Sequence, residues 1–357
     1  MNLVQELNTS GARAAETFAH QGVRYLVVPQ LCIDIPGQPA QMTLGNSDTE
    51  ALVYRWENGR FLPHGALPVP GGEDAEFFTI GHRAFLATAS LRTGAGPYSL
   101  DALSTVFELI DGRFVPFQQI PTFAAKQCKH FRIGERDFLA LALGVKMDGV
   151  VATHSHTQST LFEWDGAQFV PFQTVPSAWG YNWAFFEVGG ETLLAHADHV
   201  APSLLLRWNG EAFEPFQELD GKSGRAFCFF ESQGEAWLAF ANLHGQTLLY
   251  RWQDGRFAVH QVLSGPGGRE FCWIETARGG RLVQVNFLLG TREAPITTLQ
   301  SCVYRFENGQ LVVDQLFNTL GGTDVTSFTE EGTTHLVVTE SLSAEVRFRT
   351  PSKVYTL

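Results

Sequence analysis

The segment that decides the fold is Glu163-Trp164-Asp165-Gly166-Ala167-Gln168-Phe169-Val170-Pro171-Phe172-Gln173. It contains a short strand ending in an aromatic residue, an Asp-Gly turn, and a second strand that begins with Phe. Asp-Gly and Asn-Gly are strong hairpin signals, because both residues accept the positive φ that a tight turn requires. The segment therefore predicts a β-hairpin.

This pattern occurs in six quasi-regular copies along the chain. The second strands of the copies begin at Phe61, Phe114, Phe169, Phe213, Phe257 and Leu311. Each repeat also holds two further strands, such as Ala184-Phe185-Phe186 followed by Leu193-Leu194-Ala195. Four strands in a repeat of this length predict one blade of a β-propeller.

The number of blades follows from the apolar strand of each repeat, of which Tyr25-Leu26-Val27-Val28 is the first copy. Seven copies predict one all-β domain, a seven-bladed propeller of four-stranded antiparallel blades. The last blade lacks its fourth strand, and Val4-Gln5-Glu6-Leu7 is similar to Phe216-Gln217-Glu218-Leu219. We therefore expect the N-terminal strand to complete the last blade and close the ring, which removes an unpaired edge. The predicted blades span residues 14–68, 74–120, 127–175, 182–219, 225–263, 269–317, and 323–357 together with 2–8.

Composition narrows the range of partners and compartments. The 357 residues carry a net charge of −12 and form no basic run, so a nucleic acid partner is not expected. No stretch approaches 18 consecutive apolar residues, and membrane insertion is not expected either. Five cysteines without a CxxC motif indicate reduced thiols. The start of the chain has no visible signal peptide, which predicts a cytoplasmic protein, or a secreted one if a leader has been removed.

The repeats resemble the EPTP repeat, also called the epilepsy-associated or EAR repeat, of the leucine-rich glioma-inactivated proteins. The most telling pieces are Lys129-His130-Phe131, Arg225-Ala226-Phe227-Cys228 and Gly245-Gln246-Thr247-Leu248-Leu249-Tyr250-Arg251. The resemblance implies a seven-bladed propeller that binds other proteins, since the secreted neuronal members dock onto ADAM-family receptors. The leucine-rich half of those proteins is absent from this sequence, which is interpreted as a stand-alone bacterial member in which only the scaffold carries over.

Acidic residues gather on the first strands of neighbouring blades. Aligning the blades on the aromatic residue that ends this strand places Glu16, Asp74, Glu76, Glu270 and Asp324 along the central channel. Crowded carboxylates in a partly desolvated channel need a counter-charge or a proton, and Ca²⁺ takes carboxylate oxygens without strict geometry. These five residues are therefore candidate ligands of a channel Ca²⁺. Hydrated carboxylates, or one paired with Lys129, are the alternative.

The resemblance adds one argument for this metal. Asp74-Ala75-Glu76-Phe77 is similar to the Asp-x-Glu-Phe that helps to hold a channel Ca²⁺ in the leucine-rich glioma-inactivated family. The further carboxylate expected from the next blade is not matched, because Ala124 falls near that place.

Polar residues end the second strand of most blades. Gln30, Asn242, Asn286 and Glu340 are the candidate ligand-binding residues, because strand ends and the loops after them gather on one face of a propeller. Ordinary turn formation is the alternative explanation.

A third candidate group consists of histidines and one aspartate in the loops of blades three and four: His154, His156, His196, Asp198 and His199. Such residues could ligate Zn²⁺ or act as a general base, whereas exposed loop histidines without a role are also common. The chain contains no Gly-x-Ser-x-Gly, phosphate-binding loop or His-Glu-x-x-His motif.

The sequence favours a binding propeller that presents loops on one face to a protein or small-molecule ligand, with a divalent cation in its central channel as an open question. Long loops that carry apolar residues, such as the one that begins with Leu31-Cys32-Ile33, are expected to form a lid or a partner surface. The alternative function is an enzyme whose active site at the channel mouth uses Asp, Glu and His from several blades. A third is an architectural role through oligomerisation, although no oligomeric state is predicted.

Overall fold

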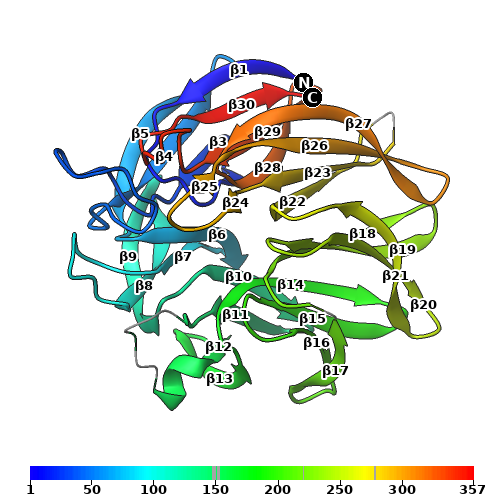
Figure 1. Ribbon diagram of the computed structural model, residues 1–357. Helices are drawn as coiled ribbons and strands as arrows, with labels where there is room; N and C mark the ends of the chain where they lie inside the picture. The colour runs from blue at the N-terminus through cyan, green and yellow to red at the C-terminus, as the bar shows by residue number, and fades with distance from the viewer. Residues whose placement is uncertain (147–149, 151–152, 220, 277–278) are drawn as a thin grey trace. The chain divides into compact units, whose positions relative to one another are not determined.

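The chain folds as a seven-bladed β-propeller, as the repeat predicts (Figure 1). The computed structural model describes residues 1–146, 150, 153–219, 221–276 and 279–357. These residues form seven four-stranded antiparallel sheets, one two-stranded ribbon and one short 3-10 helix, η1 (His154–Thr157). No helix in the described part of the chain is long and apolar enough to cross a membrane.

Each blade is a meander of four strands that are consecutive in sequence, except in blade six, where a two-stranded ribbon intervenes, and in the last blade. Blades one to four contain β2 (Glu16–His20), β3 (Val23–Val28), β4 (Glu50–Glu57) and β5 (Arg60–Pro68); β6 (Gly72–Ile80), β7 (Arg83–Ser90), β8 (Asp101–Ile110) and β9 (Arg113–Phe123); β10 (Gln127–Ile133), β11 (Arg136–Ala142), β12 (Gln158–Trp164) and β13 (Phe169–Pro176); and β14 (Gly180–Val188), β15 (Glu191–Asp198), β16 (Ser203–Trp208) and β17 (Phe213–Leu219). Blades five to seven contain β18 (Gly224–Ser232), β19 (Glu235–Asn242), β20 (Thr247–Gln253) and β21 (Arg256–Ser264); β22 (Gly268–Ile274), β23 (Arg281–Asn286), β26 (Thr298–Glu307) and β27 (Gln310–Leu320); and β28 (Gly322–Glu330), β29 (Thr333–Glu340), β30 (Ser352–Thr356) and β1 (Asn2–Leu7). The ribbon consists of β24 (Leu289–Gly290) and β25 (Pro295–Ile296).

The N-terminal strand completes the last blade, which confirms the predicted closure. β1 pairs antiparallel with β30, with Asn2 opposite Thr356 and Leu7 opposite Ser352. Figure 1 shows the two strands side by side, with both chain ends at the same edge. The blade therefore combines one strand from the start of the chain with three from its end.

A glutamine of the repeat joins four of the blades to the blade that follows, through hydrogen bonds to its backbone. Gln5 donates from Nε2 to the carbonyl of Phe61 at 2.7 Å, and its Oε1 accepts the Phe61 N–H at 2.8 Å. The same two-bond clamp joins Gln173 to Phe213, Gln217 to Phe257, and Gln261 to Leu311. Both backbone groups that the clamp satisfies would otherwise need a partner, so this glutamine is a structural part of the repeat.

The hairpin turns fall into two kinds. At Asn58-Gly59 both residues have positive φ, 51° and 81°, which is the two-residue turn that the sequence predicts. The turns at Asp165-Gly166 and Asn209-Gly210 are longer, because two residues follow each pair before the next strand begins. The Asn209 side chain there accepts the N–H groups of Glu211 and Ala212, which stabilises a longer loop.

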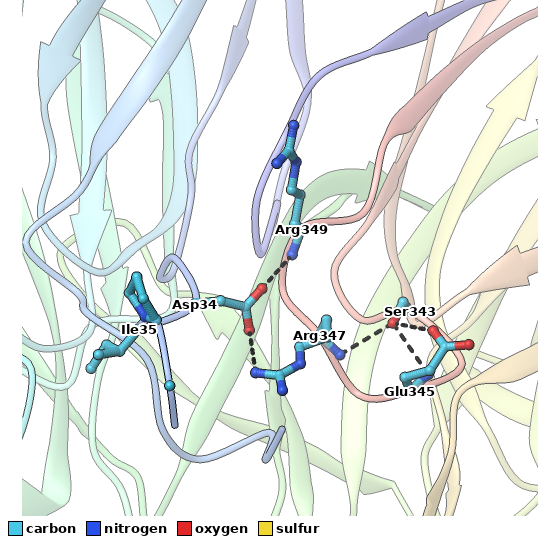
Figure 2. Close-up of a pocket in the computed structure, with 8 residues that line it drawn as sticks. Asp34, Ile35, Ser343, Glu345, Arg347 and Arg349 are labelled. Carbon is cyan, nitrogen blue, oxygen red and sulfur yellow. Dashed lines mark hydrogen bonds and ion pairs between the residues drawn. The ribbon is translucent and has the colours of Figure 1, made fainter. Parts of the chain in front are cut away.

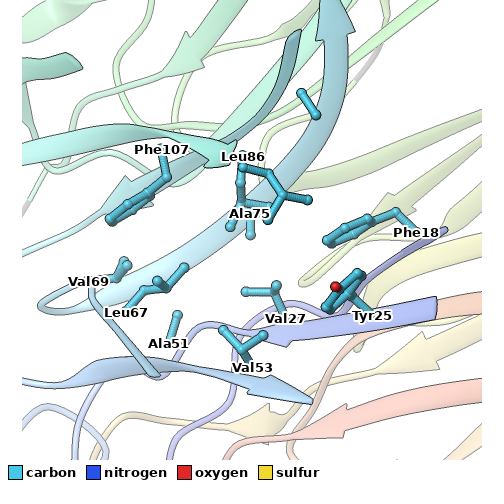
Figure 3. Close-up of a cluster of buried hydrophobic side chains, with 12 residues drawn as sticks. Phe18, Tyr25, Val27, Ala51, Val53, Leu67, Val69, Ala75, Leu86 and Phe107 are labelled. Carbon is cyan, nitrogen blue, oxygen red and sulfur yellow. The ribbon is translucent and has the colours of Figure 1, made fainter. Parts of the chain in front are cut away.

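The chain divides into two compact units, which are described separately. Unit 1 comprises residues 1–130, 290–299 and 319–357, and unit 2 comprises 131–289 and 300–318. In unit 1, Phe18, Val27, Leu86 and Phe107 belong to a buried cluster between blades one and two (Figure 3). The core of unit 2 is built in the same way, from residues that include Phe186, Leu193, Phe240 and Phe257.

Candidate functional site

Several blades begin with a β-bulge, and the residue in the bulge differs from blade to blade. In β6, β14, β18, β22 and β28 the register with the next strand shifts across one residue after the first glycine. We call these five the bulge residues: Glu73, Tyr181, Arg225, Arg269 and Thr323. A bulge re-aims the side chain that it contains, and bulges are common beside functional sites.

In blade two, which lies in unit 1, the bulge residue Glu73 is part of a buried ion-pair triad. Glu73 is 3% exposed, and its Oε1 lies 3.0 Å from Lys126 Nζ and 3.6 Å from Arg13 Nε. Arg13 and Lys126 stand at the equivalent position of their own blades, five residues before the aromatic that ends the strand. One carboxylate thus lies between two cations.

The carboxylates predicted to bind Ca²⁺ accept backbone hydrogen bonds from the next blade. Asp74 Oδ2 accepts the N–H of Cys128 at 2.9 Å, and Asp324 Oδ2 accepts that of Ala15 at 2.7 Å. In unit 2 the neutral Asn182 makes the equivalent bond, from the Phe227 N–H to its Oδ1 at 3.0 Å. This position therefore has a structural task that does not need a charge.

Lys129 supplies a counter-charge within the same cluster. Its Nζ lies 2.7 Å from Glu76 Oε1, and Glu16 Oε1 accepts the Phe77 N–H at 3.0 Å. Burial, strengthened by the neighbouring carboxylates, raises the pKa of Glu16 and of Asp74 well above their usual values. Lys129 therefore balances part of this negative charge, and the raised pKa values favour the neutral forms of Glu16 and Asp74.

The contacts of these carboxylates do not support a Ca²⁺ site. Ca²⁺ takes six to eight oxygen ligands, whereas an oxygen of each of Glu16, Asp74, Glu76 and Asp324 already accepts a protein hydrogen bond. Within the described residues, no group of three or more His, Cys, Asp or Glu is arranged to hold a metal. Glu270 lies in unit 2, where its Oε1 accepts the Phe271 N–H at 3.2 Å. The calcium site stays a prediction that these contacts do not support.

The polar residues at strand ends hold the loops that follow them. Gln30 accepts the Ser10 N–H and donates to the Glu50 carbonyl. Asn242 donates to the Lys222 carbonyl at 2.8 Å, and Asn286 donates to the Gln300 carbonyl at 2.6 Å. These contacts explain why polar side chains stand at these positions, and their role in ligand binding remains a prediction.

Glu340 lies in the interior rather than on a binding face. It is 0% exposed, and its two carboxylate oxygens lie 2.9 and 3.0 Å from Lys353 Nζ. Burial raises its pKa to about 7, although the Lys353 charge opposes the shift. An external ligand would have to displace this ion pair to reach Glu340.

The candidate histidines occupy different environments. His196 is buried, with its ring stacked 4.0 Å from that of Trp183, and burial lowers its pKa, so it is a neutral core residue. His156 Nδ1 accepts the Thr153 N–H at the start of η1. The side chain of His154 lies outside the described part of the structure. His199 contacts Trp179 edge to face at 5.0 Å.

Asp198 organises the loops around it. Its two carboxylate oxygens accept four backbone N–H groups and the Ser177 hydroxyl. Within the described residues, Asp198 and the histidines do not form a group that could hold a metal ion. A catalytic role for any of them stays a prediction.

Three loops of unit 1 form a preformed surface, which we call the loop platform. It consists of the residues between β3 and β4 (29–49), between β7 and β8 (91–100), and between β29 and β30 (341–351). Arg92 is buried at its centre and donates to the Ser47 hydroxyl and to the carbonyls of Thr43 and Leu44, each at 2.9 Å. The guanidinium also stacks 3.8 Å from the Tyr98 ring. The long loops are thus held in one arrangement.

An open pocket of about 540 Å³ lies on the loop platform, between residues 34–37 and residues 343–349 (Figure 2). Asp34 joins its two sides: its Oδ2 accepts the Arg349 N–H at 3.0 Å, and its Oδ1 lies 3.8 Å from Arg347 Nη1. Arg347 also donates to the Gln38 carbonyl at 3.0 Å. Arg92 and Arg347 were not identified from the sequence, because neither belongs to a repeated position.

The chain matches the EPTP domain over residues 113–165, 168–209 and 212–253. It is also similar to the thrombospondin-type laminin G domain and EAR repeat-containing proteins of Homo sapiens and Mus musculus. The human protein is 27% identical over 185 residues, which cover 50% of this chain and 25% of that protein. The mouse protein is 28% identical over 169 residues, 46% of this chain and 24% of that protein. The chain thus matches about a quarter of these relatives' length, and the predicted EPTP relationship is confirmed.

Among solved structures, the WD40 β-propeller domain of Doa1 superposes with a TM-score of 0.58 at 10% identity. The match covers 99% of this chain and 96% of that one. At this identity the likeness concerns the fold alone.

Proposed function

We propose that this EPTP-repeat propeller is a binding module that presents the loop platform to a segment of a partner protein. EPTP propellers are in general protein-interaction modules. The observation that carries the proposal is the network of Arg92 and Arg347, which fixes loops from three blades around an open pocket. A surface that is already ordered loses little conformational entropy when a partner binds.

The chemistry of the pocket suits a polypeptide more than a small apolar ligand. Its lining combines two arginines with Asp34 and Glu345, beside the apolar Ile35 and Pro36. Ile33, which directly precedes Asp34 in the sequence, exposes 42% of its surface. Mixed charges around apolar contacts are the usual composition of a protein interface rim.

Site-specific photocrosslinking in cells that naturally make the protein tests this proposal. A photoreactive phenylalanine analogue replaces Ile35 at the pocket, and a matched control carries it at Val313, an exposed position of β27. We expect a discrete protein adduct from position 35 that is absent from position 313 and is lost when Arg347→Ala is added. No protein adduct at position 35, or the same adduct at both positions, would refute a partner at the loop platform.

A further inference from the structure

The bulge residues of unit 2 carry the second feature of functional interest. Tyr181, Arg225 and Arg269 each follow the glycine that begins β14, β18 and β22. The three bulges place one aromatic and two cationic side chains at the same position of three successive blades.

These side chains gather around one phenol ring. The guanidinium carbon of Arg225 lies 3.8 Å from the centre of the Tyr181 ring, and that of Arg269 lies 5.2 Å from it. The rings of His199 and Trp179 lie 5.9 and 6.1 Å from the same ring. Arg225 is 4% exposed and Arg269 is 7% exposed, so the two cations are withdrawn from bulk water.

Within the described residues, the charge of Arg269 has no carboxylate counter-charge. Among the residues that the structure describes, Arg269 makes no hydrogen bond or ion pair, and its guanidinium lies over the Tyr181 ring. The nearby carboxylate of Asp198, which accepts the Trp179 N–H, is already occupied by five donors. A buried guanidinium without a carboxylate is costly, because the stacked ring replaces only part of its hydration.

An unsatisfied hydrogen-bond donor lies in the same cluster. The indole Nε1 of Trp179 is buried, and no acceptor for it is found within the described part of the chain. Buried donors in native proteins are nearly always paired. Two independent groups around Tyr181, the Arg269 cation and the neutral Trp179 donor, therefore both lack an acceptor among the residues that the structure places.

We propose that Arg225, Arg269 and Tyr181 form a binding site for a carboxylate group, with the Trp179 indole N–H as an additional donor. A guanidinium binds a carboxylate through two parallel hydrogen bonds. The singly charged carboxylate is favoured over a doubly charged phosphate because Asp198 lies beside the cluster and the chain as a whole carries a net charge of −12. The ring centre of the exposed His244 lies 5.6 Å from that of His199, so His244 lies on the side of the cluster that faces solvent.

The site is tested by thermal unfolding in succinate, one carboxylate of which is expected to bind while the other stays in solvent, with sodium chloride at equal ionic strength as the reference. Because a ligand that binds only the folded state raises Tm, we expect succinate to raise it by about 2 °C or more at saturation. The Arg269→Gln variant removes the charge at similar size and is expected to lose this rise. Arg207→Gln is the matched control, because Arg207 is an exposed arginine of the same unit that also stacks on an aromatic ring.

A second measurement separates binding from packing. Without succinate, Arg269→Gln is expected to have the same Tm as the unsubstituted protein or a higher one, since it removes an unpaired buried charge. Arg269→Lys keeps the charge without the bidentate fork and is expected to weaken succinate binding about tenfold. An Arg269→Gln variant with a lower Tm and an unchanged succinate response would overturn the site. A larger stabilisation by phosphate than by succinate would overturn the carboxylate assignment.

Binding can also be observed directly by NMR at His244. Burial and the Arg225 charge lower the pKa of His244, so a bound carboxylate is expected to raise it. An unchanged His244 titration in saturating succinate would contradict binding at this cluster.

Discussion

Glu73 in unit 1 and Arg269 in unit 2 occupy the same bulge of the repeat, with opposite consequences. Glu73 lies between Lys126 and Arg13, so its charge is compensated inside the protein. Arg269 stacks on Tyr181 and has no described carboxylate partner. The backbone is the same at both places, and the difference lies in which side chains fill neighbouring bulges. A compensated bulge stabilises the fold, whereas an uncompensated one is available to a ligand.

The next position along the strand supports this comparison. Asp74 in unit 1 and Asn182 in unit 2 accept the same backbone hydrogen bond from the following blade. Since the amide performs the structural task, the charge of Asp74 is an additional property of unit 1.

The largest effect is expected from removing the carboxylate of the triad. Glu73→Gln removes the buried carboxylate that lies between Lys126 and Arg13 and is expected to lower the free energy of unfolding by about 3–5 kcal/mol. Denaturant unfolding measures the change. Glu57→Gln is the control, because Glu57 forms an exposed pair with Arg55 whose loss costs at most about 1 kcal/mol. Equal effects of the two substitutions would show that the triad is not a special feature of unit 1.

A carboxylate can be introduced among the bulge residues of unit 2, none of which is acidic. Tyr181→Glu places an acid beside Arg225 and Arg269, as Glu73 stands beside its cations, and is expected to abolish the rise of Tm in succinate. Tyr181→Phe keeps the ring and is expected to retain it. If Tyr181→Glu still responded to succinate, the charge balance of the bulges would not control binding.

The charge of Asp74 is expected to make stability depend on pH. Burial is the main cause that raises the pKa of this carboxyl, and the charges of Glu76 and Asp324 add to it, although the Cys128 N–H opposes the shift. The folded state therefore keeps a proton that the unfolded state has lost, and stability falls as pH rises above the usual pKa of Asp until the folded carboxyl has also ionised. Asp74→Asn is expected to stabilise the protein at pH 8 by roughly 1–3 kcal/mol and to have little effect near pH 4.

Unfolding curves of both proteins across this range measure the difference. Glu16, whose pKa is also raised, and Lys129 remain in both proteins, so the two sets of curves differ by the Asp74 charge and its effect on these two neighbours. A constant offset between the two proteins at every pH would contradict the assignment.

The smallest expected effect concerns a feature that the two units share. Gln5→Ala in unit 1 and Gln217→Ala in unit 2 each remove two hydrogen bonds to the backbone of the following blade. Each is expected to lower the free energy of unfolding by about 1–3 kcal/mol. A much smaller effect of Gln5→Ala would show that the N-terminal strand is held less firmly than a strand within the chain.

The sequence predicted the blades because their signals are local. An Asn-Gly or Asp-Gly pair determines a hairpin within a few residues, and the likeness of Val4–Leu7 to Phe216–Leu219 was sufficient to predict β1. The alignment also identified Glu16, Asp74 and Glu76 as members of one cluster. The hydrogen-bond partners of these carboxylates depend on how neighbouring blades are aligned, which no local pattern encodes. The backbone N–H groups that donate to the carboxylates were therefore not predicted.

The bulge residues were missed for a different reason. Tyr181, Arg225 and Arg269 stand five positions before the reference aromatic, and strict alternation along a strand assigns odd positions to the opposite face. The bulge interrupts this alternation, so the side chain of the bulge residue does not point to the face that alternation predicts. The repeated Gly-Arg pairs at Gly224-Arg225 and Gly268-Arg269 were the available signal, since glycine often marks a bulge.

The pairing of β1 with β30 also determines an order of events during synthesis. β1 leaves the ribosome before the other strands of the propeller, but its partner begins only at Ser352. At about 5–20 residues per second, translation of roughly 350 residues takes about 20–70 s. For that time Leu3 and Val4, which remain exposed even in the folded protein, belong to a strand without a neighbour. Within the propeller, the strand that is made before all the others is therefore the last to pair, and a nascent propeller would be most open to mispairing at this segment.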